Sequence, residues 1–315
     1  MAVAANSAEI YELVAGDAEV ERLATGLVFT EGPVWHPDGY LLFSDVAGNV
    51  VIRWDESGEA LDWRRPSNHA NGLVLDAEYR LLACEHDRSV VTRTEHDGRI
   101  TIVASHYQEK ELNSPNDVIV ASDGSVWFTD PHPAGRTAAW GVERPAELDW
   151  NGVYRLPPGG GEPELLVDDF EFPNGLCLSP DEAVLYVNDT LRMHIRAFDV
   201  RPDWTLANGR ELIAQGPALM MEGGRIVQPE EPTRADPGFP DGMKCDERGN
   251  LYCTGPGGVW VIAPGGEHLG TIQTPEIAAN MAWGGDDRRT LYITASTSLY
   301  RIEMKVRGAA LPHLA

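Results

Sequence analysis

The sequence lacks long apolar segments and has little positive charge. No stretch of the 315 residues approaches the run of about eighteen apolar residues that a membrane-spanning helix needs, and the N-terminus has neither the basic nor the apolar region of a signal peptide. Lys and Arg total 25 against 49 Asp and Glu, which gives a net charge of −24. This charge argues against nucleic acid and anionic membrane surfaces as partners. We therefore expect a cytoplasmic protein with a hydrated, acidic surface.

Cysteine is also scarce, and no two cysteines form a CxxC pair. Each of the four lies within or beside an apolar, strand-like run, at positions Cys84, Cys177, Cys245 and Cys253. A small buried thiol suits such a run. We expect core thiols rather than a zinc site or a disulfide framework.

Helical periodicity is almost absent, and a short unit repeats six times instead. Each unit has a polar residue, an apolar run, an acidic or glycine-containing turn and a second apolar run. The units are EGPVWHPDGYLLFSDV, NGLVLDAEYRLLACEH, NDVIVASDGSVWFTDP, NGLCLSPDEAVLYVNDT, DGMKCDERGNLYCTG and NMAWGGDDRRTLYITAS. The turns favour tight bends and the flanking runs favour strands, so each unit predicts a β-hairpin.

The spacing of the units predicts the architecture. They begin at residues 31, 71, 116, 174, 241 and 280, and further short strands follow each hairpin. Intervals of about 40 to 50 residues are typical of a propeller blade with four strands. We predict an all-β protein that is one six-bladed β-propeller over residues 1–315, with an early strand within residues 8–28 pairing beside SLYRIEMKV to close the ring.

Two long intervals predict loop insertions at residues 132–150 and 216–240. Both insertions are rich in Gly and Pro, and either can serve as a lid. Trp140, Trp150, Met220 and Met221 could form an apolar wall over the mouth of the channel, or could simply anchor surface loops. Residues 1–7 need not be ordered.

The innermost strand of a blade lines the central channel, so equivalent residues should form a ring around the axis. That ring is Glu31, Asn71, Asn116, Asn174, Asp241 and Asn280. At any single position, an Asn or Asp before a strand can equally be a turn residue. Six repeats of an amide or carboxylate with a varying following residue favour a functional ring. Oxygen ligands of this kind suit Ca²⁺, Mg²⁺ or Mn²⁺, and such a cation would favour hydrolysis.

The chain resembles the family of gluconolactonases, senescence-marker-protein-30 and luciferin-regenerating enzymes, and the bacterial sugar-lactonase branch most of all. The similarity extends from about Glu31 to Ile302. It is carried by EGPVW, NGLVLD, LACEH, VTRTE, LNSPNDV, SDGSVWFTDP, NGVYRL, PNGLCLSPDE, LYVNDT, FPDGMKCD and LYITASTSLYRI. The resemblance implies a small-molecule lactone as substrate and one divalent cation, Ca²⁺ first and Zn²⁺, Mn²⁺ or Mg²⁺ as alternatives.

By motif, the resemblance assigns the cation to Glu31, Asn174 and Asp241, with Asn116 on or near it. Water would attack the ester carbonyl, and Asp241 is the preferred general base, with Glu31 as the alternative. Further residues could bind substrate at the same mouth, although a structural role is the more ordinary one for each histidine. These are Asn71, Asn116, Asn280, His69, Glu85, His86, Asp130 and His132.

The sequence departs from the sugar-lactonase pattern at two places. Glu111 stands where that branch tends to have Arg, and DRSV at residues 87–90 replaces a GNRR-like run. Fewer arginines put gluconolactone itself in question as the substrate. An esterase or phosphotriesterase acting on a non-sugar compound, or a non-catalytic calcium-binding propeller, stays open. We expect a monomer or a weak homo-oligomer.

Overall fold

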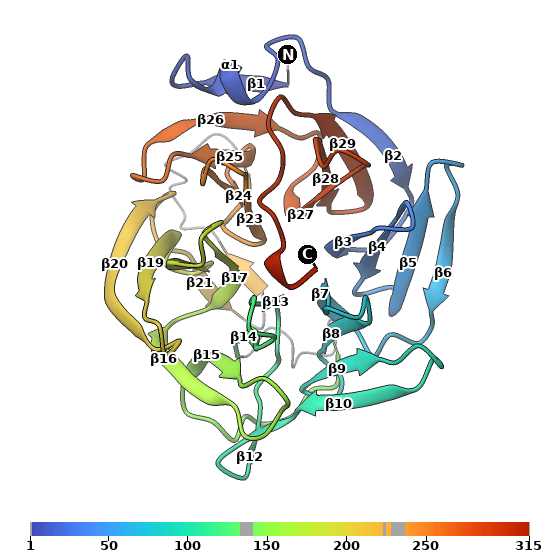
Figure 1. The fold of residues 1–315 in the computed structure, drawn as a ribbon, viewed down its shortest axis with the longest axis vertical. Helices are drawn as coiled ribbons and strands as arrows, with labels where there is room; N and C mark the ends of the chain where they lie inside the picture. The colour runs from blue at the N-terminus through green and yellow to red at the C-terminus, as the bar shows by residue number, and fades with distance from the viewer. Residues whose placement is uncertain (1, 133–140, 223–224, 228–236, 315) are drawn as a thin grey trace.

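The structure, a computed structural model, describes residues 2–132, 141–222, 225–227 and 237–314. These residues form six blades of four antiparallel strands each around a central axis (Figure 1), and one blade gains a fifth strand at its edge. The prediction of an all-β, six-bladed propeller is therefore confirmed. The described residues contain one short α-helix, α1 (Ile10–Leu13), and one 3₁₀ turn, η2 (Pro312–Leu314), and none of their helices has the length and apolar character to cross a membrane.

The first three blades follow one another along the chain, each from its innermost to its outermost strand. Blade 1 contains β3 (Thr30–His36), β4 (Tyr40–Asp45), β5 (Val50–Asp55) and β6 (Ala60–Arg64). Blade 2 contains β7 (Ala70–Leu75), β8 (Leu81–Glu85), β9 (Val90–Thr94) and β10 (Ile100–Ala104). Blade 3 contains β13 (Val118–Val120), β14 (Val126–Asp130), β15 (Asn151–Leu156) and β16 (Glu164–Phe170).

Blades 4 to 6 complete the ring. Blade 4 contains β17 (Pro173–Leu178), β18 (Val184–Asp189), β19 (His194–Val200) and β20 (Leu206–Ala214). Blade 5 contains β23 (Met243–Cys245), β24 (Leu251–Gly255), β25 (Gly258–Ile262) and β26 (His268–Gln273). Blade 6 contains β27 (Ala278–Gly284), β28 (Thr290–Ala295) and β29 (Ser298–Glu303), and its outermost strand is β2 (Glu21–Thr25).

The ends of the chain close the ring where the sequence predicted. Strand β2 pairs antiparallel with β29, with Glu21 opposite Arg301, so an N-terminal strand completes the last blade. The N-terminus also adds β1 (Val3–Ala5) to the edge of β26, which the sequence pattern did not predict, since residues 1–7 need not have been ordered. Both additions cover strand edges that would otherwise expose unpaired backbone groups.

The hydrophobic cores lie between neighbouring blades. Each strand presents side chains alternately to the two faces of its sheet, and both faces of a blade pack against another blade. Between blades 1 and 2, for example, Val34, Leu42 and Val51 meet Leu73 and Leu81. The four cysteines are free and buried, which confirms the prediction of core thiols.

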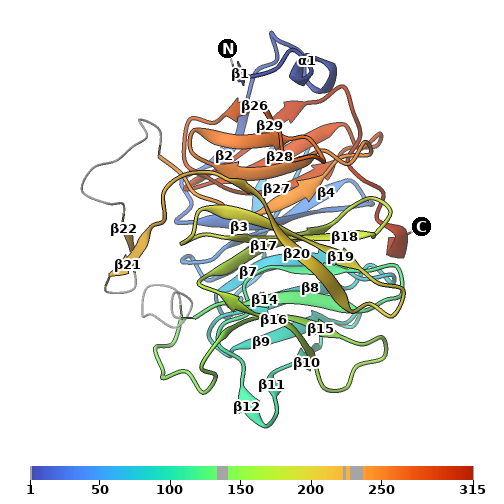
Figure 2. The same cartoon turned by 90° about the vertical axis from the view of Figure 1, so that its left-hand side faces the viewer.

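Two short hairpins stand apart from the blades. One joins blades 2 and 3 and contains β11 (His106–Tyr107) and β12 (Lys110–Glu111). The other, β21 (Met220–Glu222) with β22 (Arg225–Val227), lies in the predicted insertion at 216–240, which otherwise falls partly outside the described residues. Figure 2 shows this second hairpin on the face opposite the C-terminus.

Candidate metal centre on the propeller axis

The six predicted ring residues occupy equivalent places at the start of the innermost strands. They lie in, or within two residues before, β3, β7, β13, β17, β23 and β27, so all six are at the same end of the channel. All are buried, with exposed fractions of 1% for Glu31, 7% for Asn71, 8% for Asn116, 5% for Asn174, 5% for Asp241 and 3% for Asn280. Six polar side chains buried around one axis require partners or a ligand.

Glycine after a ring residue lets neighbouring inner strands approach closely. A Cβ on Gly32 would lie 2.0 Å from the carbonyl oxygen of Asn71, and one on Gly175 would lie 2.1 Å from the carbonyl oxygen of Asp241. In each case the glycine of one blade faces the ring residue of the next. The glycines that follow four of the six ring positions therefore have a packing function, which the sequence pattern alone did not reveal.

The structure brings two carboxylates and two amides of the ring together. Asn280 Nδ2 donates to Glu31 Oε2 at 2.9 Å, and the backbone N–H of Gly32 donates to the same oxygen at 2.6 Å. Asp241 lies close enough to Glu31 and Asn174 for both side chains to act on its carboxylate. Asn174 Nδ2 donates to Thr190 Oγ1 at 3.0 Å, so its carbonyl oxygen does not take part in that bond.

Burial of these carboxylates disfavours their charged forms. Desolvation raises the pKa of Glu31 from 4.5 to about 7, although the bonds from Asn280 and Gly32 oppose the rise. Desolvation, together with the neighbouring Glu31, raises the pKa of Asp241 well above its ordinary value. Without a cation, the pair can relieve this repulsion by holding a proton.

The donors at this position fit a hard divalent cation. Glu31, Asp241, Asn174 and Asn116 offer carboxylate and amide oxygens, the ligands that Ca²⁺, Mg²⁺ and Mn²⁺ prefer. Among the described residues, no three His, Cys, Asp or Glu side chains gather as a metal-binding group. A cation here would thus depend on two carboxylates supplemented by amide oxygens. The identity of these ligands stays a prediction.

Asp117 is an axial carboxylate that the sequence interpretation missed. It occupies the position that is glycine after four of the ring residues, it is 3% exposed, and its Oδ1 accepts the backbone N–H of Val118 at 2.9 Å. Desolvation raises its pKa, while the ammonium of Lys244 opposes the rise. The signal was available in SPND, where an acidic residue breaks the Asn-Gly pattern.

Glu85 and Asp130 lie at the ring end of the channel but serve the loops there. Asp130 Oδ2 accepts the backbone N–H of Asn113 at 2.9 Å, and its Oδ1 accepts that of Ser114 at 2.7 Å. Glu85 is fully buried and lies 3.3 Å from a guanidinium nitrogen of Arg64. Carboxylates at the same place in blades 1 and 4 also accept loop N–H groups, so the position recurs with the fold. Contact of Glu85 and Asp130 with substrate stays a prediction.

The predicted histidines lie in the loops at this end of the channel. His69 has a positive φ of 50° before β7, and its Nδ1 lies 2.9 Å from Asp87 Oδ2. His86 directly follows β8 and is 4% exposed. The backbone N–H of His132 donates to Asn151 Oδ1 at 2.6 Å. None of these contacts tests the prediction that His69 and His86 bind substrate.

The two departures from the sugar-lactonase pattern are joined by one arginine. Arg144, in the insertion at 132–150, places Nη1 3.1 Å from Glu111 Oε1 and donates from Nη2 to the carbonyl oxygen of Asp87 at 2.7 Å. A guanidinium is thus supplied to this region from the insertion. Within the proposed apolar wall, Trp150 donates to Tyr154 and Met220 is exposed, whereas Trp140 and the side chain of Met221 lie outside the described part of the chain.

Known proteins resemble this chain in sequence and in structure. A gluconolactonase of Zymomonas mobilis is 31% identical over 306 residues, covering 92% of this chain and 82% of that protein. A pentonolactonase of Haloferax volcanii is 26% identical, covering 84% and 81%. The solved structure of a gluconolactonase from Xanthomonas campestris superposes with a TM-score of 0.84 at 34% identity, covering 96% of this chain and 95% of that one. Residues 29–297 match the SMP-30/gluconolactonase/LRE-like region, and the chain belongs to this family.

Proposed function

We propose that this protein is a divalent-metal-dependent lactonase that opens the ring of a sugar lactone or a related cyclic ester. The observation that carries the proposal is the buried pairing of Glu31 with Asp241 inside a ring of amides at one end of the channel. Two such carboxylates are electrostatically unfavourable unless they bind a cation or a proton. The similarity to proteins named gluconolactonase and pentonolactonase supports a cyclic ester as the substrate.

Glu31, Asn174 and Asp241 would hold the cation, with Asn116 beside it. When bound, such a cation supplies a Lewis acid that polarises the ester carbonyl and stabilises the negative charge that develops on its oxygen. The chain fixes Glu31 before binding, because its carboxylate is held by Asn280 and Gly32. A ligand that already has its bound geometry loses less free energy to ordering when the cation binds.

Asp241 is the preferred general base. Water adds to the carbonyl carbon of the lactone, and the carboxylate of Asp241 accepts the proton that the water loses. Collapse of the tetrahedral adduct breaks the ring C–O bond, and the proton then passes to the departing alkoxide, which gives one hydroxy acid. Burial raises the pKa of Asp241 in the metal-free protein, whereas a bound cation would lower it, and Glu31 is the alternative base.

We infer that the substrate enters at the ring end of the channel, because both insertions are attached there. The insertion at 216–240 leads directly into β23, and the one at 132–150 follows the end of β14, which lies beside the start of β13. Both therefore flank the end that carries Glu31 and Asp241. Arg144 provides a cationic group at this entrance, paired with Glu111. A polyhydroxylated ester would find charged and amide groups there.

The function is tested by metal analysis and a substrate panel. The purified protein is assayed for bound metal and for proton release from aldonolactones, aliphatic lactones and phosphotriesters, with and without chelator. We expect chelator-sensitive turnover of at least one lactone. Turnover of phosphotriesters alone would favour a different hydrolase, and the absence of both metal and chelator-sensitive turnover would refute the proposal.

Substitutions assign the activity to the axial site. Asp241→Asn keeps the size of the side chain and removes the base, so we expect kcat to fall by at least about a hundredfold. Glu59→Gln removes the same charge from an exposed turn between β5 and β6 and should retain full activity. Equal activity of Asp241→Asn and the unaltered protein would exclude Asp241 as the base.

A further inference from the structure

The channel has a second layer of side chains beneath the ring. It consists of the residue three positions after each ring residue, and all six of these line one cavity of about 130 Å³: Val34, Val74, Ile119, Cys177, Lys244 and Trp283. In β3, β7 and β17, a bulge lies within the inner strand, at or next to the ring residue. Because a bulge reverses the alternation of side chains, the ring residue and the residue three positions later both face the axis. Five members are apolar, and Lys244 alone carries a charge.

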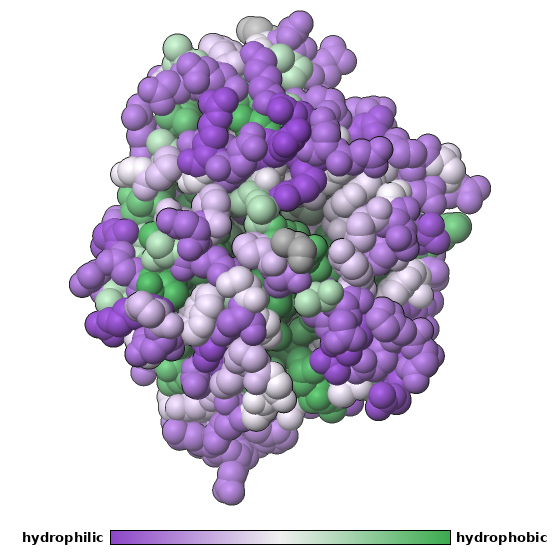
Figure 3. All heavy atoms as spheres, in the orientation of Figure 1, coloured by the Kyte–Doolittle hydropathy of each residue, from purple (hydrophilic) through white to green (hydrophobic). Residues whose placement is uncertain are grey.

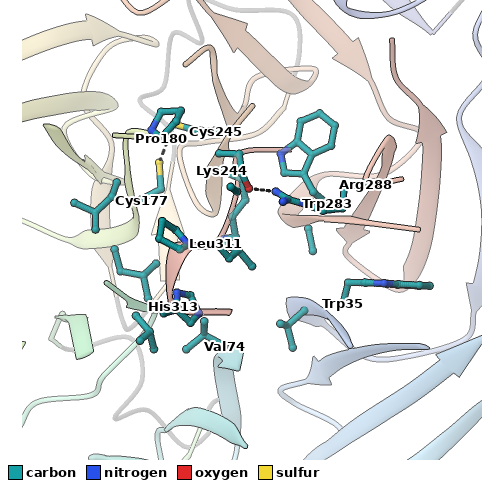
Figure 4. Close-up of a pocket in the computed structure, with 18 of the residues that line it drawn as sticks. Trp35, Val74, Cys177, Pro180, Lys244, Cys245, Trp283, Arg288, Leu311 and His313 are labelled. Carbon is teal, nitrogen blue, oxygen red and sulfur yellow. Dashed lines mark hydrogen bonds between the residues drawn. The ribbon is translucent and has the colours of Figure 1, made fainter. Parts of the chain in front are cut away.

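The C-terminal segment, residues 307–314, crosses the far end of this cavity. The backbone N–H of Ala309 donates to the carbonyl oxygen of Cys245 at 3.0 Å, and His313 Nε2 lies 3.0 Å from the carbonyl oxygen of Leu75. Leu311 and Pro312 contribute to the lining, and Figure 4 shows Leu311, His313 and Lys244 among the residues around the cavity. On the corresponding face of the molecule, hydrophobic residues gather in the hollow near the axis within a largely hydrophilic rim (Figure 3).

Lys244 is connected to the candidate metal centre through one amide. Its Nζ donates to the carbonyl oxygen of Met243 at 3.0 Å and to Asn280 Oδ1 at 3.4 Å. Asn280 Nδ2 in turn donates to Glu31 Oε2 at 2.9 Å. The backbone N–H of Met281 donates to the same Asn280 oxygen at 2.9 Å, so the ammonium shares in orienting the amide that holds Glu31.

The charges around the axis also connect Lys244 with the candidate metal centre. Three carboxylates are buried there, since Glu31, Asp117 and Asp241 are 1%, 3% and 5% exposed. Lys244 also lies close enough to Asp117 for its charge to act on that carboxylate. With all three carboxylates ionised, Lys244 and a divalent cation together would balance them. An unpaired buried charge is strongly unfavourable, so this balance has energetic weight.

We propose that Lys244 is a positioning residue that acts as an internal counter-charge for the axial carboxylates. Its ammonium stabilises the metal-free site and holds Glu31 through Asn280, and its positive charge limits the affinity of the site for a divalent cation. The inference rests on the proposed function only in placing that cation at Glu31 and Asp241.

Lys244→Met separates charge from packing, because methionine keeps an unbranched side chain that suits the apolar second layer. Removing a positive charge near the cation should tighten Ca²⁺ binding by roughly tenfold. In chelator, the same variant should melt at a lower temperature, since the buried carboxylates lose their counter-charge. Lys244→Arg keeps the charge and should bind Ca²⁺ within about twofold of the unaltered protein. Lys110→Met removes a lysine from β12, outside the blades, and is the matched control.

The experiment is calorimetric titration with CaCl₂, and separately MnCl₂, together with thermal melts in chelator and in Ca²⁺. Tighter binding by Lys244→Met with a lower melting temperature in chelator supports the proposal. Unchanged or weaker binding overturns it, since a purely structural lysine could not raise affinity when removed. If Lys244→Met folds only in Ca²⁺ while Lys244→Arg folds in chelator, the counter-charge is also supported. Failure of both variants to fold in either condition would assign Lys244 to packing and overturn it.

The outcomes separate this inference from the proposed function. If the unaltered protein binds neither cation, the metal-dependent function fails, yet the melts in chelator still test the counter-charge. A lower melting temperature of Lys244→Met than of Lys110→Met would then support the stabilising role of Lys244. Equal melting temperatures would overturn it.

Discussion

Replacing Glu31 with glutamine should stabilise the metal-free protein while it destroys the cation site. The carboxylate of Glu31 is 1% exposed, and desolvation raises its pKa from 4.5 to about 7. Glutamine is neutral at every pH, and its carbonyl oxygen can still accept the hydrogen bonds that Asn280 and Gly32 donate. Glu31→Gln therefore imitates the protonated form of the native residue.

The size and pH range of the effect follow from the change in pKa. A group whose pKa is higher in the folded state stabilises the fold when protonated, and that contribution is lost as the pH rises through its folded-state pKa. For Glu31, the metal-free protein should lose stability progressively between pH 4.5 and about 7. The difference corresponds to roughly 3 kcal/mol at most. In a chain of this length, that is a melting-temperature difference of roughly 5 °C.

Thermal melts in chelator from about pH 5 to pH 8 test this reasoning. We expect Glu31→Gln to melt close to the unaltered protein at about pH 5 and roughly 5 °C above it at about pH 8. Added Ca²⁺ should raise the melting temperature of the unaltered protein and leave that of the variant unchanged. Glu59→Gln, in an exposed turn, should follow the unaltered protein throughout. A variant that melts at or below the unaltered protein at about pH 8 in chelator would refute the argument.

Three further substitutions test the fold around the site. Gly175→Ala should lower both stability and cation affinity, because the new Cβ would lie 2.1 Å from the carbonyl oxygen of Asp241, and calorimetric melts with Ca²⁺ titration measure both. Arg64→Met should destabilise the protein by about 3 kcal/mol in denaturant melts, since it removes a cation 3.3 Å from the fully buried Glu85. Glu276→Gln should lower stability near neutral pH but not below about pH 2. Desolvation raises the pKa of Glu276, but hydrogen bonds led by that from Ser298 outweigh it and lower the pKa to about 2. The contribution of Glu276 to stability is therefore present above its unfolded pKa and is lost on acidification.

The sequence predicted the architecture because the hairpin pattern recurs six times. Alternating apolar residues and tight turns are local properties, the number of units predicts the number of blades, and the interval between units predicts four strands in each. The closing strand, β2, was also predictable, because a ring leaves a strand edge that the chain ends can cover. Strand β1 was not, since the short segment VAA has no distinctive pattern and pairs with β26 only once that edge exists.

The candidate site could be predicted in part. A position that recurs as Asn, Asp or Glu in every unit identified the ring without any knowledge of the blades in space. Glu85 and Asp130 show the limit of this reasoning, because they also follow a repeated strand, yet their partners are a buried guanidinium and loop N–H groups. Those contacts join segments distant in the sequence, and a pattern of residues within one unit does not reveal them.

The residues that break the repeat carry the charge of the axis. At the ring position, Glu31 and Asp241 replace the amide of the other four blades. At the next position, Asp117 stands where four blades have glycine, and in the second layer Lys244 stands among apolar side chains. A repeat by itself gives six equivalent positions. Such positions can close a ring, but they cannot make one side of the axis differ in charge from the other. Three buried carboxylates and one ammonium make that ring asymmetric. They also oppose folding unless their charges are balanced, and the proposed cation at the axis would supply that balance.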